Sequence, residues 1–396
     1  MIANTDLHLH SKYSKGTSKF MSIDNIVKYG KLKGLDIIGT GDCLNPKWLD
    51  EIKNHLDDNL VLTTEIEDKH RVHHLIILPN LAQTNDLINY LSSHSKNIGY
   101  EGRPNVSLDG KEIMDIVKEL GGLIGPAHVF TPWTSLYKTY NSVYDCYGKK
   151  PDYIELGLSA DTDMADMVEE LRDIPFLSNS DAHSFYPHRM GREFNQMEIS
   201  NVGDIEHNFE EIRNAIKNNK IVANYGLDPN LGKYHTTACT KCYLRYDIED
   251  AIKFKFKCRE CGGTIKKGVL ERSKELSKDK KVIHPDFRPP YHRIIPLAEI
   301  ISFSIGKGVN TKSVQTLYDN YLHNFKNEIE ILIKSDIGAL KAIHETVGQT
   351  VEKFRNNTIN IYPGGGGEYG YISKTPVKIK KYEQKTTLEN WMAQNQ

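Results

Sequence analysis

The chain has 396 residues, of which 51 are Lys or Arg and 52 are Asp or Glu, so its formal net charge is −1 at pH 7. Its 39% hydrophobic and 26% charged residues are ordinary for a globular protein and exclude a disordered chain. No apolar run approaches the ~20 residues of a membrane-spanning helix, and the first residues lack the basic and apolar regions of a secretory signal. We therefore expect a cytoplasmic protein with no membrane partner, in which any binding of nucleic acid depends on local basic surface.

Residues 1–225 alternate short apolar runs with amphipathic stretches. The apolar runs predict strands at 37–39, 60–62, 74–78, 123–125, 153–155 and 175–177. Stretches whose apolar residues recur every three or four positions predict helices at 23–33, 81–94, 109–120, 164–171 and 205–218. This alternation is typical of parallel βα units, which gather their active site at the carboxyl ends of the strands. We expect a catalytic domain here.

The character of the chain changes after residue 225. Residues 226–290 are Lys-rich, carry four of the six cysteines and show helical periodicity only at 247–257, which predicts a small separate module. Apolar periodicity resumes in residues 291–370, where helices are predicted at 295–304, 311–324, 326–334 and 336–354. A glycine run within this region precedes a basic tail, residues 371–396.

Polar side chains with metal-binding chemistry stand at the N-terminus and after the predicted strands. Asp6, His8 and His10 alternate with Leu7 and Leu9, so a strand would put the three polar side chains on one face. Two imidazoles on one face can hold a metal ion, and Asp6 can orient one of the rings. Further carboxylates and imidazoles directly follow predicted strands: Asp42, Glu65, His128, Asp181 and His183. Scattered loop residues would not repeat in type and position in this way, so we expect a metal cluster.

His73 and His74 both precede an apolar run, and only one of two neighbours can point toward a given face. We expect His74 to be the ligand, with His73 packing or hydrogen-bonding elsewhere. The predicted ligands are His8, His10, Asp42, Glu65, His74, His128, Asp181 and His183. This set exceeds what one tetrahedral site needs, so two or three ions that share carboxylates are predicted. Clustered metals activate water and neutralise phosphoryl charge, which makes phosphate ester hydrolysis the expected chemistry.

Four cysteines form a pair of C-x-x-C knuckles in the Lys-rich module. They are Cys239, Cys242, Cys258 and Cys261. Their spacing is that of a tetrahedral structural zinc site, and isolated buried thiols are the alternative. Such a site has no open coordination position, so it stabilises a small fold and does no chemistry.

The motifs DLHLH, TGD, TTE, HL, GPAH and SDAH, in this order, resemble those of the PHP (polymerase and histidinol phosphatase) superfamily. The resemblance implies an α/β fold, a distorted (β/α)7 barrel, with two or three ions of zinc, manganese or iron, and magnesium as a further candidate for activity. It also implies that Glu65, Asp181 and His183 take part in catalysis. Where the superfamily usually has another histidine, this chain has Asn45. Either Asn45 replaces that histidine as a weaker ligand, or the site binds one of its ions less tightly.

A narrower resemblance covers nearly the whole chain. The segments GPAHVFTPWTSLY, SDAHSFYPHRMGREF, RPPYHRIIPLAEII and PGGGGEYG, together with the cysteine knuckles, are similar to endonuclease Q, a family within this superfamily. That resemblance implies a DNA-repair endonuclease that binds damaged DNA. It implies cleavage of the phosphodiester on the 5′ side of deaminated bases, such as hypoxanthine and uracil, and of abasic sites.

Basic residues near the predicted site and in the cysteine module are candidates for contact with DNA phosphates. These candidates are Arg103, His188, Arg189, Arg192, Lys255 and Lys257. The alternative is an ordinary solvated surface. Aromatic residues at 133, 137 and 186 either line a pocket for an extruded base or pack in the core.

The C-terminal segment resembles a sliding-clamp-binding peptide, with Leu388, Trp391 and Met392 as the anchors of one helical turn. A disordered amphipathic end is the alternative.

Two other functions compete with the endonuclease. A small-molecule phosphatase would leave the cysteine module and the clamp-like tail without a purpose, and it would hydrolyse a free phosphate monoester without cutting DNA. A non-catalytic DNA-binding module would bind DNA without cleaving it at any divalent ion. Asn45 is the one feature that favours this last hypothesis.

Overall fold

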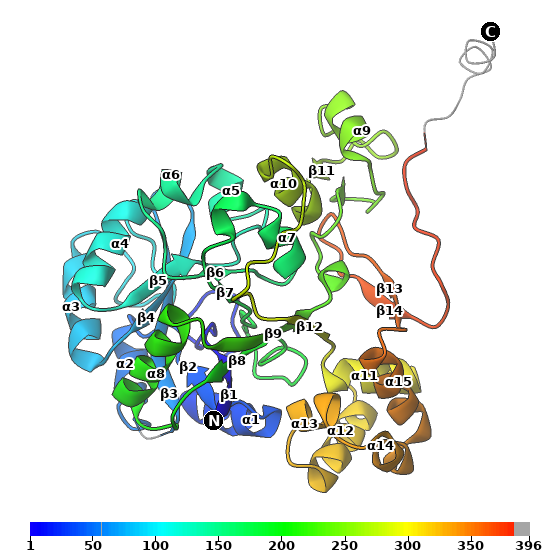
Figure 1. Cartoon of the computed structure of the whole chain (residues 1–396), viewed down its shortest axis with the longest axis horizontal. Helices are drawn as coiled ribbons and strands as arrows, with labels where there is room; N and C mark the ends of the chain where they lie inside the picture. The colour runs from blue at the N-terminus through cyan, green and yellow to red at the C-terminus, as the bar shows by residue number, and fades with distance from the viewer. Residues whose placement is uncertain (57, 384–396) are drawn as a thin grey trace.

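The computed structural model describes residues 1–56 and 58–383, and an eight-stranded sheet curls through its N-terminal part (Figure 1). In order across the sheet, the strands are β12 (Tyr291–Ile294), β9 (Ile221–Leu227), β8 (Phe194–Glu198), β1 (Ile2–Asp6), β2 (Ile37–Gly39), β3 (Leu60–Glu67), β4 (His73–Leu78) and β5 (Leu123–Pro126). β1, β2 and β3 are parallel, whereas β4 is antiparallel to both β3 and β5. The expectation of parallel units throughout is wrong here, because the short turn between β3 and β4 has no room for the crossover that a parallel pair needs.

Two short strands complete the curl. They are the parallel pair β6 (Ile154–Glu155) and β7 (Phe176–Leu177). The N–H of Val129, just after β5, donates to the carbonyl at the end of β6 at 2.9 Å. On the other side, the N–H of His10 donates to the carbonyl of Ala182 at 3.0 Å, which joins the segment after β1 to the segment after β7. These bonds close β1 to β7 into a ring, and the expected barrel is confirmed.

Helices cover the outside of this barrel (Figure 1). They are α1 (Ile23–Lys33), α2 (Pro46–Ile52), α3 (Leu81–Ser92), α4 (Gly110–Glu119), α5 (Leu136–Thr139), α6 (Val143–Tyr147), α7 (Thr162–Asp166) and α8 (Ile205–Lys217). Asp109 and Glu112 form a capping box at the start of α4, which explains why this helix begins where it does. The helix predicted at 164–171 is instead α7 followed by the 3-10 turn Glu169–Leu171, because Val168 between them is extended.

Two apolar clusters form the core of the barrel. The larger one lies among the sheet, the surrounding helices and the C-terminal helices. The smaller one joins residues of β1 to β5, such as Val61 and Leu75, to Phe209 and Ile212 of α8. Since α8 packs mainly against β3, it holds one face of the sheet in place and leaves the strand ends free for the site.

After β9 the chain forms a small module around the four cysteines. Its elements are the 3-10 turn Pro229–Leu231, β10 (Ala238–Cys239), α9 (Ile248–Lys253), β11 (Ile265–Lys266) and α10 (Val269–Leu276). The helical periodicity noted at 247–257 ends with α9, because Lys255 and Phe256 have positive φ angles of 49° and 56° that a right-handed helix cannot hold.

β12 returns the chain to the main sheet beside β9, and a helical region follows as expected. It contains α11 (Leu297–Ile305), α12 (Lys312–Asn324), α13 (Glu328–Ile333), α14 (Ile337–Ile343) and α15 (Glu345–Arg355), then the hairpin of β13 (Asn360–Tyr362) and β14 (Tyr371–Ser373). The single helix predicted at 336–354 is two, because the extended backbone of His344 separates α14 from α15. Within the described part of the chain, no helix has the length and apolar character needed to cross a membrane.

One buried ion pair joins the barrel to the helical region. Lys33 Nζ, at the end of α1, lies 2.7 Å from Glu328 Oε1, at the start of α13, and both side chains are buried. The Tyr318 hydroxyl donates to Glu328 Oε2 at 2.7 Å, and the N–H of Leu297 donates to Oε1 at 2.9 Å. Glu328 therefore receives donors from α1, α11 and α12. A buried carboxylate with this many partners becomes costly when one charged partner is removed.

We predict that Lys33→Met lowers the free energy of unfolding by about 3–5 kcal/mol, because it leaves Glu328 as an uncompensated buried charge. Chemical denaturation measures the change. The control is Lys31→Met, which removes an exposed lysine of the same helix, 3.7 Å from Asp58, and should cost at most about 1 kcal/mol. Equal stability of the two variants would contradict the assignment.

Candidate metal centre and its pocket

His8, His10 and Asp181 bring three ligand atoms together at the point where β1 and β7 end. Asp181 Oδ1 lies 3.2 Å from His10 Nε2 and 3.7 Å from His8 Nε2. Both rings are buried, and Asp181 faces the pocket with 29% of its side chain exposed. His183 lies beside them, its ring 4.4 Å from that of His10, and its Nδ1–H donates to the Asp181 carbonyl at 3.1 Å. His183 Nε2 therefore stays available as a ligand.

Glu65, His73 and His128 form the second group of ligand atoms. Glu65 Oε1 lies 2.7 Å from His73 Nδ1 and 3.0 Å from His128 Nε2, and Oε2 lies 3.4 Å from His10 Nε2. The two groups thus meet at Glu65, whose carboxylate would be a ligand for ions held by either group. His74, the ligand that the sequence predicted here, is not part of this group: His73 occupies this place, and the alternation of β4 sends His74 to the opposite face.

Asp42 and Asn45, both expected near the ions, have other partners. Asp42 Oδ1 lies 3.1 Å from His10 Nδ1, and Oδ2 accepts from the N–H and the hydroxyl of Ser11 at 2.6 and 2.7 Å. Asp42 therefore orients His10 and lies behind it. Asn45 Oδ1 accepts from the N–H groups of Lys47 and Trp48, so Asn45 caps α2 and does not extend the cluster.

Glu155, at the end of β6, is a site residue that the sequence analysis missed. Both of its carboxylate oxygens lie 3.0 Å from His8 Nδ1, and it also accepts from the N–H of His128 and from Asn179 Nδ2, each at 2.8 Å. A carboxylate on Nδ1 fixes the tautomer that presents Nε2 to a metal. Glu155 directly follows an apolar run, so the rule that selected Glu65 would have found it.

The charges of the cluster depend on one another. Burial alone would raise the pKa of Asp181, but the hydrogen bond from His10 and the charge of His8 hold it well below its usual range. Burial also acts on Glu65, and His73 and Arg103 likewise lower the pKa of that carboxyl well below the ordinary value. Burial lowers the pKa of His8, and the charges of Glu155 and Asp181 outweigh it and raise the pKa to about 10. The carboxylates are therefore ionised and demand cations.

The backbone dihedral angles also show that the fold forces several site residues into an unfavourable conformation. Asp42, His128 and Asp181 have φ angles of 48°, 31° and 46°, a region that residues with a side chain rarely adopt. Strain of this kind persists only where the surrounding structure enforces it, and it clusters at functional sites. Each of these residues lies two to four positions after the end of a strand, so the strained backbone of the turn sets the direction of its side chain.

The residues present fit divalent ions. Within the described chain, His8 Nε2, His10 Nε2 and Asp181 Oδ1 are buried atoms without a hydrogen-bond partner. Buried polar atoms are nearly always paired, so a group of unpaired ligand atoms in one place fits the binding of a cation. Imidazole and carboxylate donors suit zinc, manganese and iron.

A pocket of about 620 Å³ opens over the cluster. Its lining includes His73, Arg103, His128, Glu155, Asp181 and His183 from the site, together with Trp133, Arg189, Arg192, Lys233, Tyr234 and Tyr369. The Arg189 guanidinium and the Lys233 ammonium lie 5.7 and 5.3 Å from the centre of the Tyr369 ring. Cations and aromatic faces therefore surround the ligand atoms, as a phosphate with an attached base requires.

One predicted DNA contact and two aromatic residues for which pocket lining and core packing were both left open lie outside the pocket. His188 is buried outside the pocket lining, where burial and the charges of Arg189 and Lys33 lower its pKa to about 4, so the structure does not support it as a pocket contact. Tyr137 is a core residue whose hydroxyl donates to Glu170. Tyr186 is exposed and does not line the pocket either.

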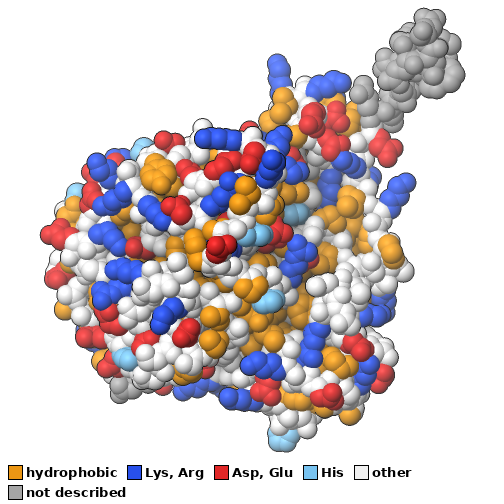
Figure 2. All heavy atoms as spheres, in the orientation of Figure 1, with side chains coloured by type: hydrophobic (Ala, Val, Ile, Leu, Met, Phe, Trp, Pro, Cys, Tyr) orange, Lys and Arg blue, Asp and Glu red, His pale blue; other side chains and the backbone are white. Residues whose placement is uncertain are grey.

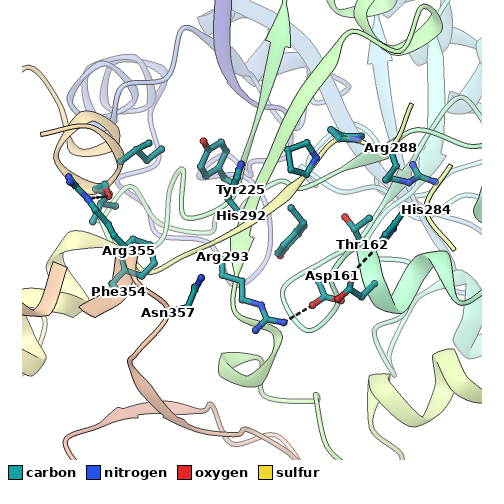
Figure 3. Close-up of a pocket in the computed structure, with 16 residues that line it drawn as sticks. Asp161, Thr162, Tyr225, His284, Arg288, His292, Arg293, Phe354, Arg355 and Asn357 are labelled. Carbon is teal, nitrogen blue, oxygen red and sulfur yellow. Dashed lines mark hydrogen bonds and ion pairs between the residues drawn. The ribbon is translucent and has the colours of Figure 1, made fainter. Parts of the chain in front are cut away.

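A larger pocket, of about 880 Å³, lies between the barrel and the helical region (Figure 3). Figure 2 shows hydrophobic side chains in a hollow on this face of the molecule. Its charged groups already have partners: Arg293 pairs with Asp161 and Asp228, and Arg288 with Asp166. No group of metal-ligand atoms lies among its lining residues in the described chain, so the smaller pocket is the candidate site.

The four cysteines meet in the small module. Cys239 Sγ lies 3.5 Å from Cys261 Sγ, and Cys242 Sγ lies 3.6 Å from Cys258 Sγ, which is the edge length of a tetrahedron of thiolates around zinc. Nearby, Lys266 Nζ lies 3.7 Å above the Trp133 ring, so the module reaches the edge of the pocket. Lys255 and Lys257 are exposed on it. Figure 2 shows that Lys and Arg are mixed with acidic residues on this part of the surface.

A curled α/β barrel with a histidine and carboxylate cluster at its strand ends defines a metal-dependent hydrolase of the PHP type. Comparison with known proteins is more specific. The crystal structure of the lesion-specific endonuclease PfuEndoQ from Pyrococcus furiosus is 48% identical, with 99% of each chain covered and a TM-score of 0.89. This chain belongs to the endonuclease Q family.

Two further relatives agree with this membership. Endonuclease Q in complex with a 27-mer duplex substrate with an abasic lesion at the active site is 48% identical, covers 97% of this chain and 99% of that one, and has a TM-score of 0.90. An uncharacterized protein of Methanocaldococcus jannaschii, MJ0043, is 31% identical over the full length of both chains. The family model for the MJ0043 C-terminal domain matches residues 296–358, which form the helical region.

We predict that Glu155→Gln weakens binding of a divalent ion at the cluster by about 10- to 100-fold, because the amide lacks the charge that polarises His8. Calorimetric titration with Mn²⁺ measures the affinity. Glu198→Gln, an exposed glutamate on β8, is the matched control and should bind like the unmodified chain. Unchanged affinity in Glu155→Gln would show that Glu155 does not position His8.

Proposed function

We propose that this chain is a DNA-repair endonuclease that hydrolyses the phosphodiester on the 5′ side of a damaged nucleotide, either a deaminated base or an abasic site. The observation that carries the proposal is the cluster of ligand atoms around Glu65, under a pocket lined by arginines and aromatic rings. Family membership adds the DNA substrate, since a relative of this length and similarity holds duplex DNA with an abasic lesion at its active site.

The ions would be held by His8, His10, Glu65, His73, His128, Asp181 and His183. Divalent ions here, whether zinc, manganese, iron or magnesium, would activate water for attack on phosphorus and neutralise charge on the leaving oxygen. Glu155 and Asp42 hold the rings of His8 and His10 so that both Nε2 atoms face the ions. Zinc in the four-cysteine module would be structural.

The rest of the pocket would bind the damaged strand. Arg103 Nη1 lies 2.9 Å from Glu65 Oε2, so it reaches the ligand atoms and can contact the scissile phosphate. Arg189 lies further out, against Tyr369, where a flanking phosphate would pass. Trp133, Tyr234 and Tyr369 offer faces on which a base can stack once it is extruded from the duplex.

The sliding clamp remains a proposed partner, because the peptide with Leu388, Trp391 and Met392 lies outside the described residues. Location in the cytoplasm is likewise a prediction from the sequence.

We predict that Asp181→Asn slows cleavage of a duplex with one abasic site by more than about 100-fold, because it removes a ligand charge at the centre of the cluster. An end-labelled strand reports the rate and the position of the cut, and parallel duplexes with hypoxanthine or uracil test the deaminated-base preference. Cleavage should leave a 3′-hydroxyl and a 5′-phosphate.

Asp163→Asn is the control for this experiment, since Asp163 is an exposed carboxylate in the other pocket. It should cut at the unmodified rate. Undiminished cutting by Asp181→Asn would refute the metal-site assignment. Binding without cutting by the unmodified chain at every divalent ion would favour the non-catalytic module instead.

We predict that replacing Lys255 and Lys257 with alanine weakens binding of damaged and undamaged duplexes alike and lowers the salt dependence of binding by about two counterions. Each lysine contributes roughly 0.9 to the slope of log K against log salt when it neutralises one phosphate. Fluorescence anisotropy over a series of salt concentrations measures the slope. Lys149→Ala, an exposed lysine after α6, should leave the slope unchanged, and an unchanged slope in the double variant would exclude the module as a DNA contact.

A further inference from the structure

A third group of metal-ligand atoms lies apart from both the catalytic cluster and the four cysteines. Asp68, His74 and Cys146 each offer one ligand atom, and these atoms lie within 4.8 Å of one another. All three residues are buried. Neither the catalytic pocket nor the larger pocket includes any of them among its lining residues.

Three separate elements bring these residues together. His74 lies on β4 next to His73, and the alternation of the strand points it away from the catalytic cluster. Asp68 lies in the turn between β3 and β4, where its Oδ1 accepts from the N–H groups of His70 and Val72 at 2.8 Å. Cys146 comes from α6, on the outside of the barrel. Asp68 is thus fixed by one oxygen, and its other oxygen points toward His74.

The ligand atoms that face one another lack ordinary partners. His74 Nε2 and Asp68 Oδ2 are buried without a hydrogen bond of good geometry in the described chain, although they lie only 3.3 Å apart. The other ring nitrogen, His74 Nδ1, lies 2.7 Å from the Tyr147 hydroxyl. A histidine held by its Nδ1 in this way can present the lone pair of Nε2 to an ion, as metal-ligating histidines commonly do.

A glycine leaves space for this group. A Cβ atom at Gly110, the first residue of α4, would lie 2.5 Å from Cys146 Sγ and 3.1 Å from His74 Cε1. Gly110 has no positive φ that would by itself require glycine. Position 110 therefore excludes a side chain because the sulfur and the imidazole occupy that volume.

We propose that Asp68, His74 and Cys146 bind a divalent ion of the zinc class at a structural site outside the barrel. A thiolate, an imidazole and a carboxylate are the ligands that zinc takes, and the separation of 3.3 Å between Oδ2 and Nε2 suits two ligands of one tetrahedral ion. Three protein ligands leave the fourth tetrahedral position to a water molecule, but the three residues are buried and line neither pocket, so the ion would do no chemistry on a substrate. It ties the β3–β4 turn and α6 to β4, and so holds the strand whose other face presents His73.

The direct test is anomalous diffraction at the zinc absorption edge from crystals of the full chain purified without chelator. We expect a peak among Asp68 Oδ2, His74 Nε2 and Cys146 Sγ, separate from any peaks at the catalytic cluster and the four cysteines. An empty position after growth with added Zn²⁺ would overturn the proposal and leave a hydrogen-bonded Asp68–His74 pair.

Metal analysis of variants gives a second measurement. Cys146→Ala should lose one zinc per chain relative to the unmodified protein, and Asp68→Asn, which keeps the oxygen that accepts from the turn, should lose it on mild dialysis. Val143→Ala is the control, because it removes a buried side chain from the same helix without removing a ligand. If Cys146→Ala fails to fold, Asp68→Asn decides. Unchanged zinc content in the folded ligand variants would refute the site.

Discussion

The structure depends on the burial of carboxylates that must remain ionised. Glu65 and Asp181 lie among imidazoles at the ends of strands from opposite sides of the barrel. A carboxylate taken out of water costs several kcal/mol unless cations and donors surround it. The histidines and Arg103 meet part of this demand, and the buried ligand atoms without partners indicate that ions meet the rest. Because the buried negative charges need positive partners, histidines and an arginine from distant parts of the sequence lie close together here.

The barrel brings these residues together, and the chain segments that carry them adopt strained backbone conformations. Two glycines show how closely the chain segments approach at the strand ends. A Cβ at Gly41, where φ is 60°, would lie 2.1 Å from the carbonyl oxygen of Leu9, and one at Gly157, where φ is 76°, would lie 2.7 Å from His128 Cβ. These glycines and the positive φ angles of Asp42, His128 and Asp181 show that the backbone at the strand ends is strained. Strain of about 1–3 kcal/mol per residue can persist because the apolar clusters beneath stabilise the strands.

The pocket over the ligand cluster is built by three separate parts of the chain. The barrel contributes Arg103, Trp133 and Arg189, the first residues of the cysteine module contribute Lys233 and Tyr234, and the segment just after the glycine run at 364–367 contributes Tyr369. The N–H of Gly364 donates to the carbonyl of Asn230 at 2.7 Å, which holds the glycine run against the start of the module. A DNA strand in the pocket would therefore touch parts that the sequence places in three regions. This composite wall suits recognition of a damaged nucleotide better than of a small phosphate ester.

The sequence by itself determined the chemistry of this protein. Ligand-type residues recur after successive apolar runs, so His8, His10, Glu65, His128, Asp181 and His183 could be selected, and the spacing of the cysteines predicted the second cluster. These signals are local, because period-two alternation and motif spacing act within a few residues. Only the tertiary structure decided which of His73 and His74 enters the cluster, since that depends on how β4 is turned within the sheet. It also decided the roles of Asp42, Asn45 and Glu155, because whether a carboxylate or amide binds an ion or orients a ring depends on neighbours from distant strands.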